Sequence, residues 1–214
     1  MSVDSSESAC LLRQAAAGDK DSWGALLTRH EGRLRRMIAF RLDQRLQGRI
    51  DPSDVLQEVC LEASEGLADY TRRPTLSFFL WLRGITGHKL QELHRYHLGT
   101  QMRDAGREVS LYRGTFPETS SAALAAHLLG HATRPSEAAV RAEVKIRLQE
   151  ALNTMDAIDR EVLALRHFEH LSIAEVARVL DLKEKAAGKR YLRALKRLRD
   201  ILASLPGGLE GFGP

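Results

Sequence analysis

Cysteine is scarce in this sequence, and long apolar runs are missing from it. The two cysteines, Cys10 and Cys60, form no C-x-x-C pair, which argues against a disulfide scaffold and a zinc ribbon. No apolar run reaches the ~18 residues that a membrane-spanning helix requires. The opening residues MSVDSSES lack the basic and apolar regions of a signal peptide. We therefore expect a cytoplasmic protein without membrane insertion.

The sequence also lacks the glycine-rich and nucleophile motifs of the common enzyme families. It contains no G-x-x-x-x-G-K-[ST], no G-x-G-x-x-G and no G-x-S-x-G. His94 and His97, like His127 and His131, have helical spacing, but no cysteine, aspartate or glutamate completes a convincing ligand set beside them. We expect no catalytic residue, no metal site and no cofactor. An enzyme is the weakest interpretation of this chain.

What the chain does contain is helical periodicity, with almost no strand signal. Apolar residues recur at helical spacing over residues 10–46, and the sequence GDKDS at 18–22 interrupts them with capping residues. A third helix is expected to begin at Asp51 and Pro52, because proline suits the first helical turn. A fourth helix is expected over about 77–98.

The segment 99–135 differs in composition from what surrounds it. Gly, Thr, Ser and Pro are scattered around an Ala/Leu patch at 122–129, which is typical of a linker with one short helix. Helical patterns resume at residue 136 and continue to 205. We predict an all-α fold with two small helical domains, at 9–98 and 136–205, joined by a linker at 99–135.

Charge is distributed unevenly along the chain. The formal net charge is +4, yet the stretch DPSDVLQEVCLEASEGLADY at 51–70 holds six acidic residues and no Lys or Arg. At about 100° per residue, four carboxylates share one side of this helix and apolar residues share the other. The carboxylates are Asp54, Glu58, Glu62 and Glu65, and the opposite side holds Leu56, Cys60, Ala63 and Leu67.

This row of carboxylates has two interpretations. The first is an ordinary solvated face of an amphipathic helix. The second is a binding surface for a basic protein, because like charges at i,i+4 are mildly destabilising and no cation within the helix offsets them. Neither interpretation places nucleic acid on this helix.

A cationic segment near the C-terminus is the better candidate for nucleic acid. The sequence LSIAEVARVLDLKEKAAGKRYLRALKRLRDIL predicts two helices separated by the short break DLK. Ser172 and Glu175 form a capping box at the first helix. The second, from about Glu184, carries eight Lys or Arg between 183 and 199 against one Glu. This is the helix-turn-helix layout, whose second helix enters the major groove; a basic solvated helix in a bundle is the alternative.

The cations of the second helix fall into two groups. The first group is expected to face DNA, since positions 185, 189 and 193 share one side of the helix, and it consists of Lys185, Lys189, Arg190 and Arg193. The second group is better placed for phosphates, which bind without reading sequence, and it consists of Lys196, Arg197 and Arg199.

The sequence resembles a known family at this point. The blocks ALNTMDAIDREVLALRHFEHLSIAEVARVLDL and KRYLRALKRL resemble the promoter-binding fourth region of sigma-70 family sigma factors. DPSDVLQEVCLEA followed by SFFLWLRGITGHKLQELHR resembles their second region, in the compact extracytoplasmic-function (ECF) type. The resemblance spans about 9–98 and 137–203, with both blocks in the family's order.

The resemblance implies residue roles in the second region. The D-x-x-Q-E pattern, here Asp54, Gln57 and Glu58, implies docking on a basic coiled coil of the largest subunit of core RNA polymerase. The following helix is implied to recognise and melt the −10 promoter element. Its candidate DNA contacts are Trp81, Arg83, His88, Glu92 and Arg95. Phe78, Phe79 and Trp81 could stack unpaired bases, although a core role is favoured for Phe78 or Trp81.

The sequence departs from the family pattern at a few positions. Gly87 and His88 stand where members usually have an Arg-Asn pair, and Asp181 replaces the usual glycine of the turn. Lys183 is a poor N-cap, and Gly188 within the recognition helix costs about 1 kcal/mol relative to alanine.

These observations favour a sigma factor, a dissociable polymerase subunit that directs the enzyme to promoters and catalyses no reaction itself. The expected partners are core RNA polymerase and promoter DNA, with an anti-sigma protein as a further candidate. The alternative is a stand-alone helix-turn-helix repressor or activator, which would usually be a dimer to match a palindromic site.

Overall fold

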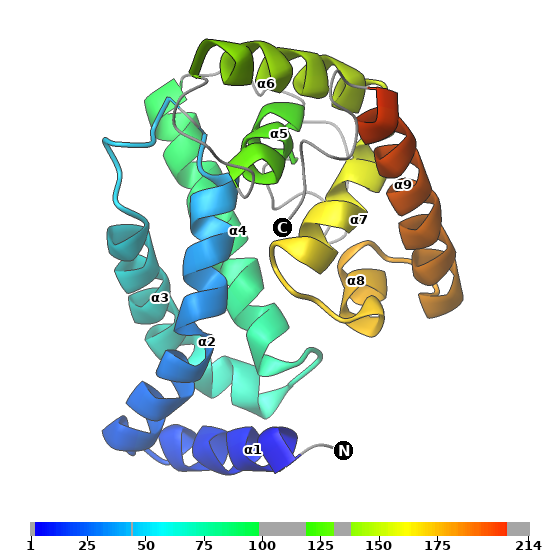
Figure 1. The fold of residues 1–214 in the computed structure, drawn as a ribbon. Helices are drawn as coiled ribbons and strands as arrows, with labels where there is room; N and C mark the ends of the chain where they lie inside the picture. Colours follow the sequence, from blue (N-terminus) through cyan, green and yellow to red (C-terminus); the bar gives the residue numbers. More distant parts are fainter. Residues whose placement is uncertain (1–2, 44, 99–118, 131–137, 205–214) are drawn as a thin grey trace. The chain divides into compact units, whose positions relative to one another are not determined.

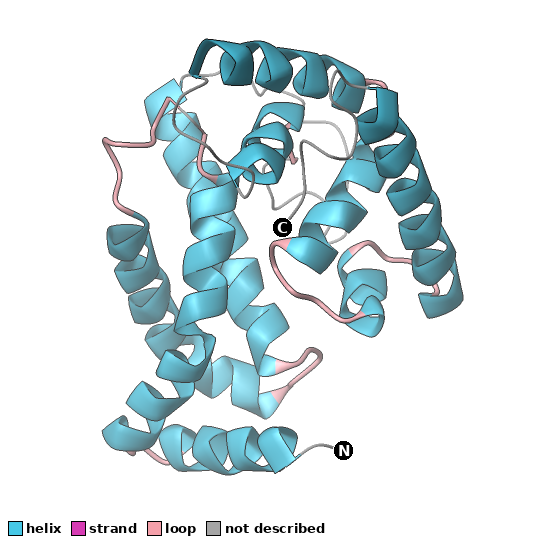
Figure 2. Ribbon diagram, viewed as in Figure 1, coloured by secondary structure: helices cyan, strands magenta, loops and turns pink. Residues whose placement is uncertain are grey.

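The computed structural model describes residues 3–43, 45–98, 119–130 and 138–204. These residues contain nine helices and no strand, as Figures 1 and 2 show. One isolated bridge joins Gln47 and Ile50 in the loop before the third helix. The prediction of an all-α fold is confirmed.

The chain divides into two compact units. Unit 1 comprises Met1–Leu42 and Leu46–Ala105, and unit 2 comprises Asp43–Arg45 and Gly106–Pro214. Unit 1 contains α1 (Val3–Ala16), α2 (Lys20–Arg41), α3 (Pro52–Arg72) and α4 (Phe78–Leu98). Unit 2 contains α5 (Ser121–Gly130), α6 (Ala138–Asn153), α7 (Ala157–His167), α8 (Ile173–Val179) and α9 (Glu184–Ser204). Most of the predicted linker lies outside the described residues, which resume at 119.

Short polar residues cap the start of two helices of unit 1, α2 and α3. The Asp19 carboxylate accepts a hydrogen bond from the Asp21 amide (3.1 Å), and the Asp51 carboxylate accepts one from the Ser53 amide (2.7 Å). The hydrogen bond from the Ser53 backbone lowers the pKa of Asp51. Both caps lie where the sequence predicted helix starts.

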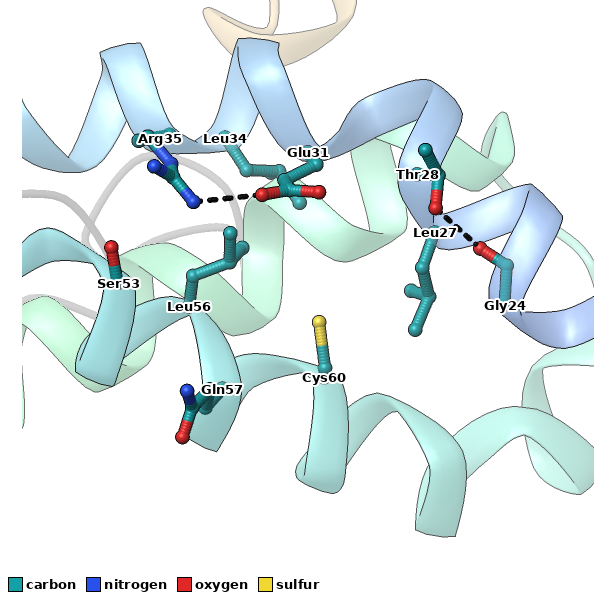
Figure 3. Close-up of a pocket in the computed structure, with 10 residues that line it drawn as sticks. All are labelled: Gly24, Leu27, Thr28, Glu31, Leu34, Arg35, Ser53, Leu56, Gln57 and Cys60. Atoms are coloured by element: carbon teal, nitrogen blue, oxygen red, sulfur yellow. Dashed lines mark hydrogen bonds and ion pairs between the residues drawn. The ribbon is translucent and has the colours of Figure 1, made fainter.

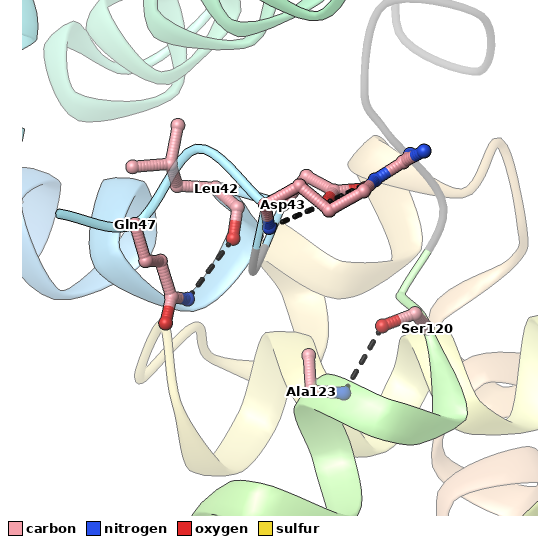
Figure 4. A network of polar contacts seen from close by, with 6 residues as sticks. Leu42, Asp43, Gln47, Ser120 and Ala123 are labelled. Carbon is pink, nitrogen blue, oxygen red and sulfur yellow. Dashed lines mark hydrogen bonds and ion pairs between the residues drawn. The ribbon is translucent and has the colours of Figure 1, made fainter. Parts of the chain in front are cut away.

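The loop between α2 and α3 is tied to the end of α2. The Gln47 side-chain amide donates to the Leu42 carbonyl oxygen (3.1 Å), as Figure 4 shows. The Arg45 guanidinium forms two hydrogen bonds to the Asp43 carboxylate, each 3.0 Å long. The same figure shows the start of α5, where the Ser120 hydroxyl accepts a hydrogen bond from the Ala123 amide (3.0 Å).

The core of unit 1 is formed where α2, α3 and α4 pack against one another. Large aliphatic side chains fill it, each burying enough apolar area to contribute about 1.5–3 kcal/mol. The fully buried ones include Leu26, Met37, Ile38, Val59, Leu82 and Leu90. Because α3 contributes large buried residues on one side only, its opposite side is left to solvent.

In unit 2, α8 and α9 form the predicted helix-turn-helix. The capping box is present: the Ser172 hydroxyl accepts from the Glu175 amide, and the Glu175 carboxylate accepts from the Ser172 amide (2.8 Å). The turn that follows α8 places Asp181 at φ 52°, in the left-handed region that aspartate tolerates better than most residues. The turn therefore forms without its usual glycine.

Candidate protein and nucleic-acid interfaces

The polar side of α3 is an exposed acidic surface. We define the acidic face by its five polar residues, Asp54, Gln57, Glu58, Glu62 and Glu65, of which Glu62 is half-buried and the others are exposed. The opposite side is buried through Val55, Leu56, Val59, Ala63 and Leu67. The predicted division of this helix is correct, except that Cys60 is only half-buried. Burial raises the pKa of the Cys60 thiol.

One carboxylate of the acidic face does have a cation beside it, which corrects the expectation of an unrelieved row. The Lys89 ammonium of α4 lies 3.2 Å from a Glu58 oxygen and 3.5 Å from a Glu92 oxygen. Burial opposes the charge of Lys89, but the two carboxylates outweigh it and the pKa of Lys89 is raised. Asp54, Glu62 and Glu65 form no ion pair among the residues that the structure describes.

A pocket of about 410 Å³ adjoins the acidic face between α2 and α3 (Figure 3). Leu27 and Leu34 of α2 line it, together with Leu56, Gln57 and Cys60 of α3. An ion pair between Arg35 and Glu31 (2.7 Å) borders it. The surface beside Gln57 is therefore hollowed and partly apolar, unlike the carboxylate row itself.

The five residues of α4 that the resemblance implied as DNA contacts differ in how far they are exposed to solvent. Arg95 is exposed, and His88 and Glu92 keep 52% and 43% of their side-chain surface. These three residues recur at i, i+4 and i+7 and so share one face of α4. Arg83 is 1% exposed, which corrects its assignment, because a guanidinium in the interior cannot reach DNA.

The aromatic residues at the start of α4 belong mainly to the core. Phe78 and Phe79 are 8% and 4% exposed. Trp81 is half-buried and stacks on Tyr70, with ring centroids 4.5 Å apart. Phe78 meets Trp23 edge-on at 6.0 Å. The core role favoured for Phe78 is confirmed, and Trp81 keeps only part of its surface for a ligand.

On α9, one set of cations points to solvent. We define the cationic face as Lys185, Lys189, Arg193 and Lys196, all exposed and spaced by three or four residues. The opposite side packs through Ala187, Ala194 and Leu198. Arg199 is also exposed, and its guanidinium forms an ion pair with Asp200 (3.1 Å). Lys183 is exposed too, but it precedes the helix. Helical spacing thus predicted that Lys185, Lys189 and Arg193 share an outward side, and Lys196, expected to bind phosphates, lies on the same side.

Two arginines of α9 turn toward their own unit instead. The Arg190 guanidinium forms an ion pair with the Asp159 carboxylate of α7 at 2.8 Å. The Arg197 guanidinium donates to the Thr154 carbonyl oxygen. In the free chain both guanidinium groups are thus engaged by protein oxygens, and the expected DNA contacts of the two residues stay predictions.

Sequence reasoning missed one exposed residue that lies among those of the cationic face. Leu192 is 66% exposed, three residues after Lys189 and four before Lys196. Its spacing could have identified it, because it lies on the polar side of the same helical wheel. A leucine exposed among cations offers an apolar contact, such as a thymine methyl group accepts in the major groove.

A cluster of metal-ligating side chains and a membrane-spanning helix are two features that the described residues, 3–43, 45–98, 119–130 and 138–204, do not contain. Within the described ranges, no three His, Cys, Asp or Glu residues gather closely enough to hold a metal ion. None of the described helices combines the length and apolar character needed to cross a membrane.

Comparisons with known proteins agree with this geometry. The family described as "Sigma-70, region 4" matches residues 145–198, which include α7, α8 and most of α9. The chain is 29% identical over 194 residues to the ECF RNA polymerase sigma factor SigD of Mycobacterium tuberculosis, covering 91% of this chain and 83% of that protein. It is 28% identical over 194 residues to the RNA polymerase sigma factor CnrH of Cupriavidus metallidurans, covering 90% and 92%.

A solved structure also shares the fold. This is CnrH in complex with the cytosolic domain of CnrY, with a TM-score of 0.55 at 24% sequence identity. The likeness covers 94% of this chain and 99% of the other. The similarity therefore extends well beyond the helix-turn-helix.

Proposed function

The chain belongs to the sigma-70 family as an ECF-type RNA polymerase sigma factor, and we propose how its surfaces share the work of transcription initiation. Its function is to direct RNA polymerase in transcription initiation, which sets it apart from a stand-alone repressor. In this proposal residues 9–98 are the second sigma region, 136–205 are the fourth, and 99–135 join them.

The acidic face of α3 is the proposed docking site for core polymerase. The supporting observation is that Asp54, Gln57 and Glu58 are exposed together along one side of the helix. A basic coiled coil of the largest subunit is complementary in charge to this surface, and complementary charges accelerate encounter and fix register. Lys89 would have to share Glu58 with that partner, because it lies 3.2 Å away.

The cationic face of α9 is the proposed contact with the −35 promoter element. Lys185, Lys189 and Arg193 would reach base edges, and Lys196 would bind a phosphate. Leu192 would contact a thymine methyl group. The observation that carries this assignment is the exposure of these side chains on the second helix of a helix-turn-helix.

The exposed side of α4 is the proposed contact with the −10 element. His88, Glu92 and Arg95 share this side, and the half-buried Trp81 lies on it about two turns before His88. We propose no catalytic residue in the chain, which would act by binding in the cytoplasm. A protein that binds and silences it, an anti-sigma factor, is a further proposed partner.

Run-off transcription tests the proposal. Purified core polymerase is supplied with a promoter library, with and without the full chain, and the start sites are mapped. We expect specific transcripts only with the chain present, and the Lys189→Ala variant should lose those that depend on a −35 element. Identical transcripts with and without the chain would contradict the function itself.

A further inference from the structure

Arg190 lies on the packed side of the recognition helix. It comes three residues after Ala187 and four before Ala194, both fully buried, so the three share one side of α9. Its side chain is 27% exposed, and the Asp159 side chain that it meets is 11% exposed. Their 2.8 Å contact joins α9 to the first turn of α7 across 31 residues of sequence.

Besides this ion pair, α9 is held by packing through Ala187, Ala194 and Leu198 and by the hydrogen bond from Arg197 to the Thr154 carbonyl oxygen. Ala187 and Ala194, the buried residues nearest Arg190 along the helix, carry a single methyl group each, so their packing resists rotation less than larger side chains would. A charge-assisted hydrogen bond is directional, and it therefore restrains rotation more strongly than contact between methyl groups does. The Tyr191 hydroxyl, 3.2 Å from the His167 ring nitrogen, is exposed and adds a weaker restraint.

Asp159 is a suitable anchor for such a restraint. It lies in the first turn of α7, where the helix dipole favours a negative charge. Its residue surface is only 8% exposed, so a partner is needed to offset the cost of removing a carboxylate from water. If Arg190 moved to a DNA phosphate, this carboxylate would be left buried without its ion pair.

We infer that Arg190 is a positioning residue: its ion pair with Asp159 sets the rotation of α9 and so aims the cationic face at DNA. This inference rests on the proposed role of α9 in binding the −35 element. It predicts that Arg190 contributes to promoter affinity without touching a phosphate, whereas its neighbour Lys189 touches the DNA directly.

The salt dependence of promoter binding separates these roles. Holoenzyme formed from core polymerase and the full chain is titrated with promoter DNA over a range of salt concentrations. The variants are Arg190→Gln, Asp159→Asn, the double variant and Lys189→Gln as the matched control. The slope of log affinity against log salt grows with the number of cations that the protein places against the DNA. Lys189→Gln removes one such cation and should lower the slope by up to about one unit, whereas Arg190→Gln should leave it unchanged.

Affinity itself should show the coupling of the pair. Arg190→Gln and Asp159→Asn are each expected to weaken binding roughly five- to thirtyfold, and the double variant should be no weaker than either. A reduced slope for Arg190→Gln together with unchanged binding for Asp159→Asn would overturn the inference, because Arg190 would then bind DNA. Additive losses in the double variant would also overturn it.

The Lys189→Gln control also shows which proposal fails, the DNA-binding face of α9 or the positioning role of Arg190. If Lys189→Gln changes neither affinity nor slope, the DNA-binding face of α9 is wrongly assigned. If Lys189→Gln has its expected effect and Arg190→Gln has none, the face is correct and only the positioning role fails. Melting curves of each variant, recorded alongside, confirm that binding is measured on folded protein.

Discussion

The acidic face of α3 and the cationic face of α9 are built differently, although both are charged rows on amphipathic helices. Large buried residues, Val55 and Val59 among them, hold the opposite side of α3, so packing alone fixes which carboxylates are exposed. The buried side of α9 is made mainly of alanines, and two arginines reach from its flanks to oxygens of its own unit. The buried side of α3 is thus held by apolar packing, whereas α9 is also held by polar contacts of arginines that lie outside its cationic face.

Reversing one charge of the acidic face should have the largest effect. Asp54 is exposed and unpaired among the described residues, so Asp54→Arg should leave the melting curve unchanged. Against a basic partner the like charges should cost about 3 kcal/mol, which lowers the affinity for core polymerase roughly 100-fold. Capture of core polymerase on immobilised chain measures this.

Asp69→Arg is the matched control on the same helix. Asp69 is exposed but lies outside the D-x-x-Q-E pattern, and this change should weaken capture far less. It also breaks the ion pair of Asp69 with Arg72 (2.9 Å), which contributes little because both side chains are largely exposed. Equal losses in both variants would mean that total charge, not the pattern, drives docking. Glu58 is a poorer site for reversal, because an arginine there would repel Lys89.

The cationic face should give the next largest effect. Lys189→Ala is expected to weaken binding of holoenzyme to a promoter with a −35 element by about 1–2 kcal/mol, or roughly 5- to 30-fold. Core polymerase capture should not change, because α3 is intact. A footprint that still covers the −35 element at the wild-type concentration would show that α9 meets DNA with another side.

A substitution at Gly188 should change the stability of the chain without altering any of the proposed DNA contacts of α9. A Cβ atom added at Gly188 would have Ile173 Cγ2 as its nearest neighbour at 3.8 Å, an ordinary contact. Gly188→Ala should therefore stabilise the chain by about 0.5–1 kcal/mol through helix propensity. Denaturant unfolding measures this change in stability. A loss of stability would mean that a neighbouring group needs the space that a Cβ atom at position 188 would fill.

Lys89 should give the smallest effect. Lys89→Met frees Glu58 for a cationic partner, so affinity for core polymerase should rise about two- to fivefold, within the range of an exposed ion pair. Lys20→Met, an exposed lysine of the same unit, is the control and should change nothing. A loss of affinity with Lys89→Met would assign Lys89 itself to the interface.

The features that the sequence predicted correctly are local ones. The caps at Asp51 and Ser172, the left-handed Asp181 and the exposed row of α3 all follow from residues within a few positions of one another. The bounds of the two domains and the roles of the individual site residues remain predictions. The variants described above test the roles of the site residues.

Apart from the exposed Leu192, the features that the sequence missed involve long cationic side chains. Lys89 reaches from α4 to Glu58 of α3, Arg190 reaches a carboxylate 31 residues upstream, and Arg83 lies inside unit 1. Helical spacing gives the direction in which a side chain leaves the backbone. It does not give the partner that a flexible stem of three or four carbons finds on a neighbouring helix.

The central claim is that α3 serves the polymerase and α9 serves the promoter. Run-off transcription, titrated once with core polymerase and once with promoter DNA, tests it directly. Asp54→Arg should raise the half-maximal polymerase concentration at least roughly tenfold and leave that of promoter unchanged. Lys189→Ala should do the reverse. If both variants were restored by added polymerase alone, the division of labour between the two helices would be contradicted.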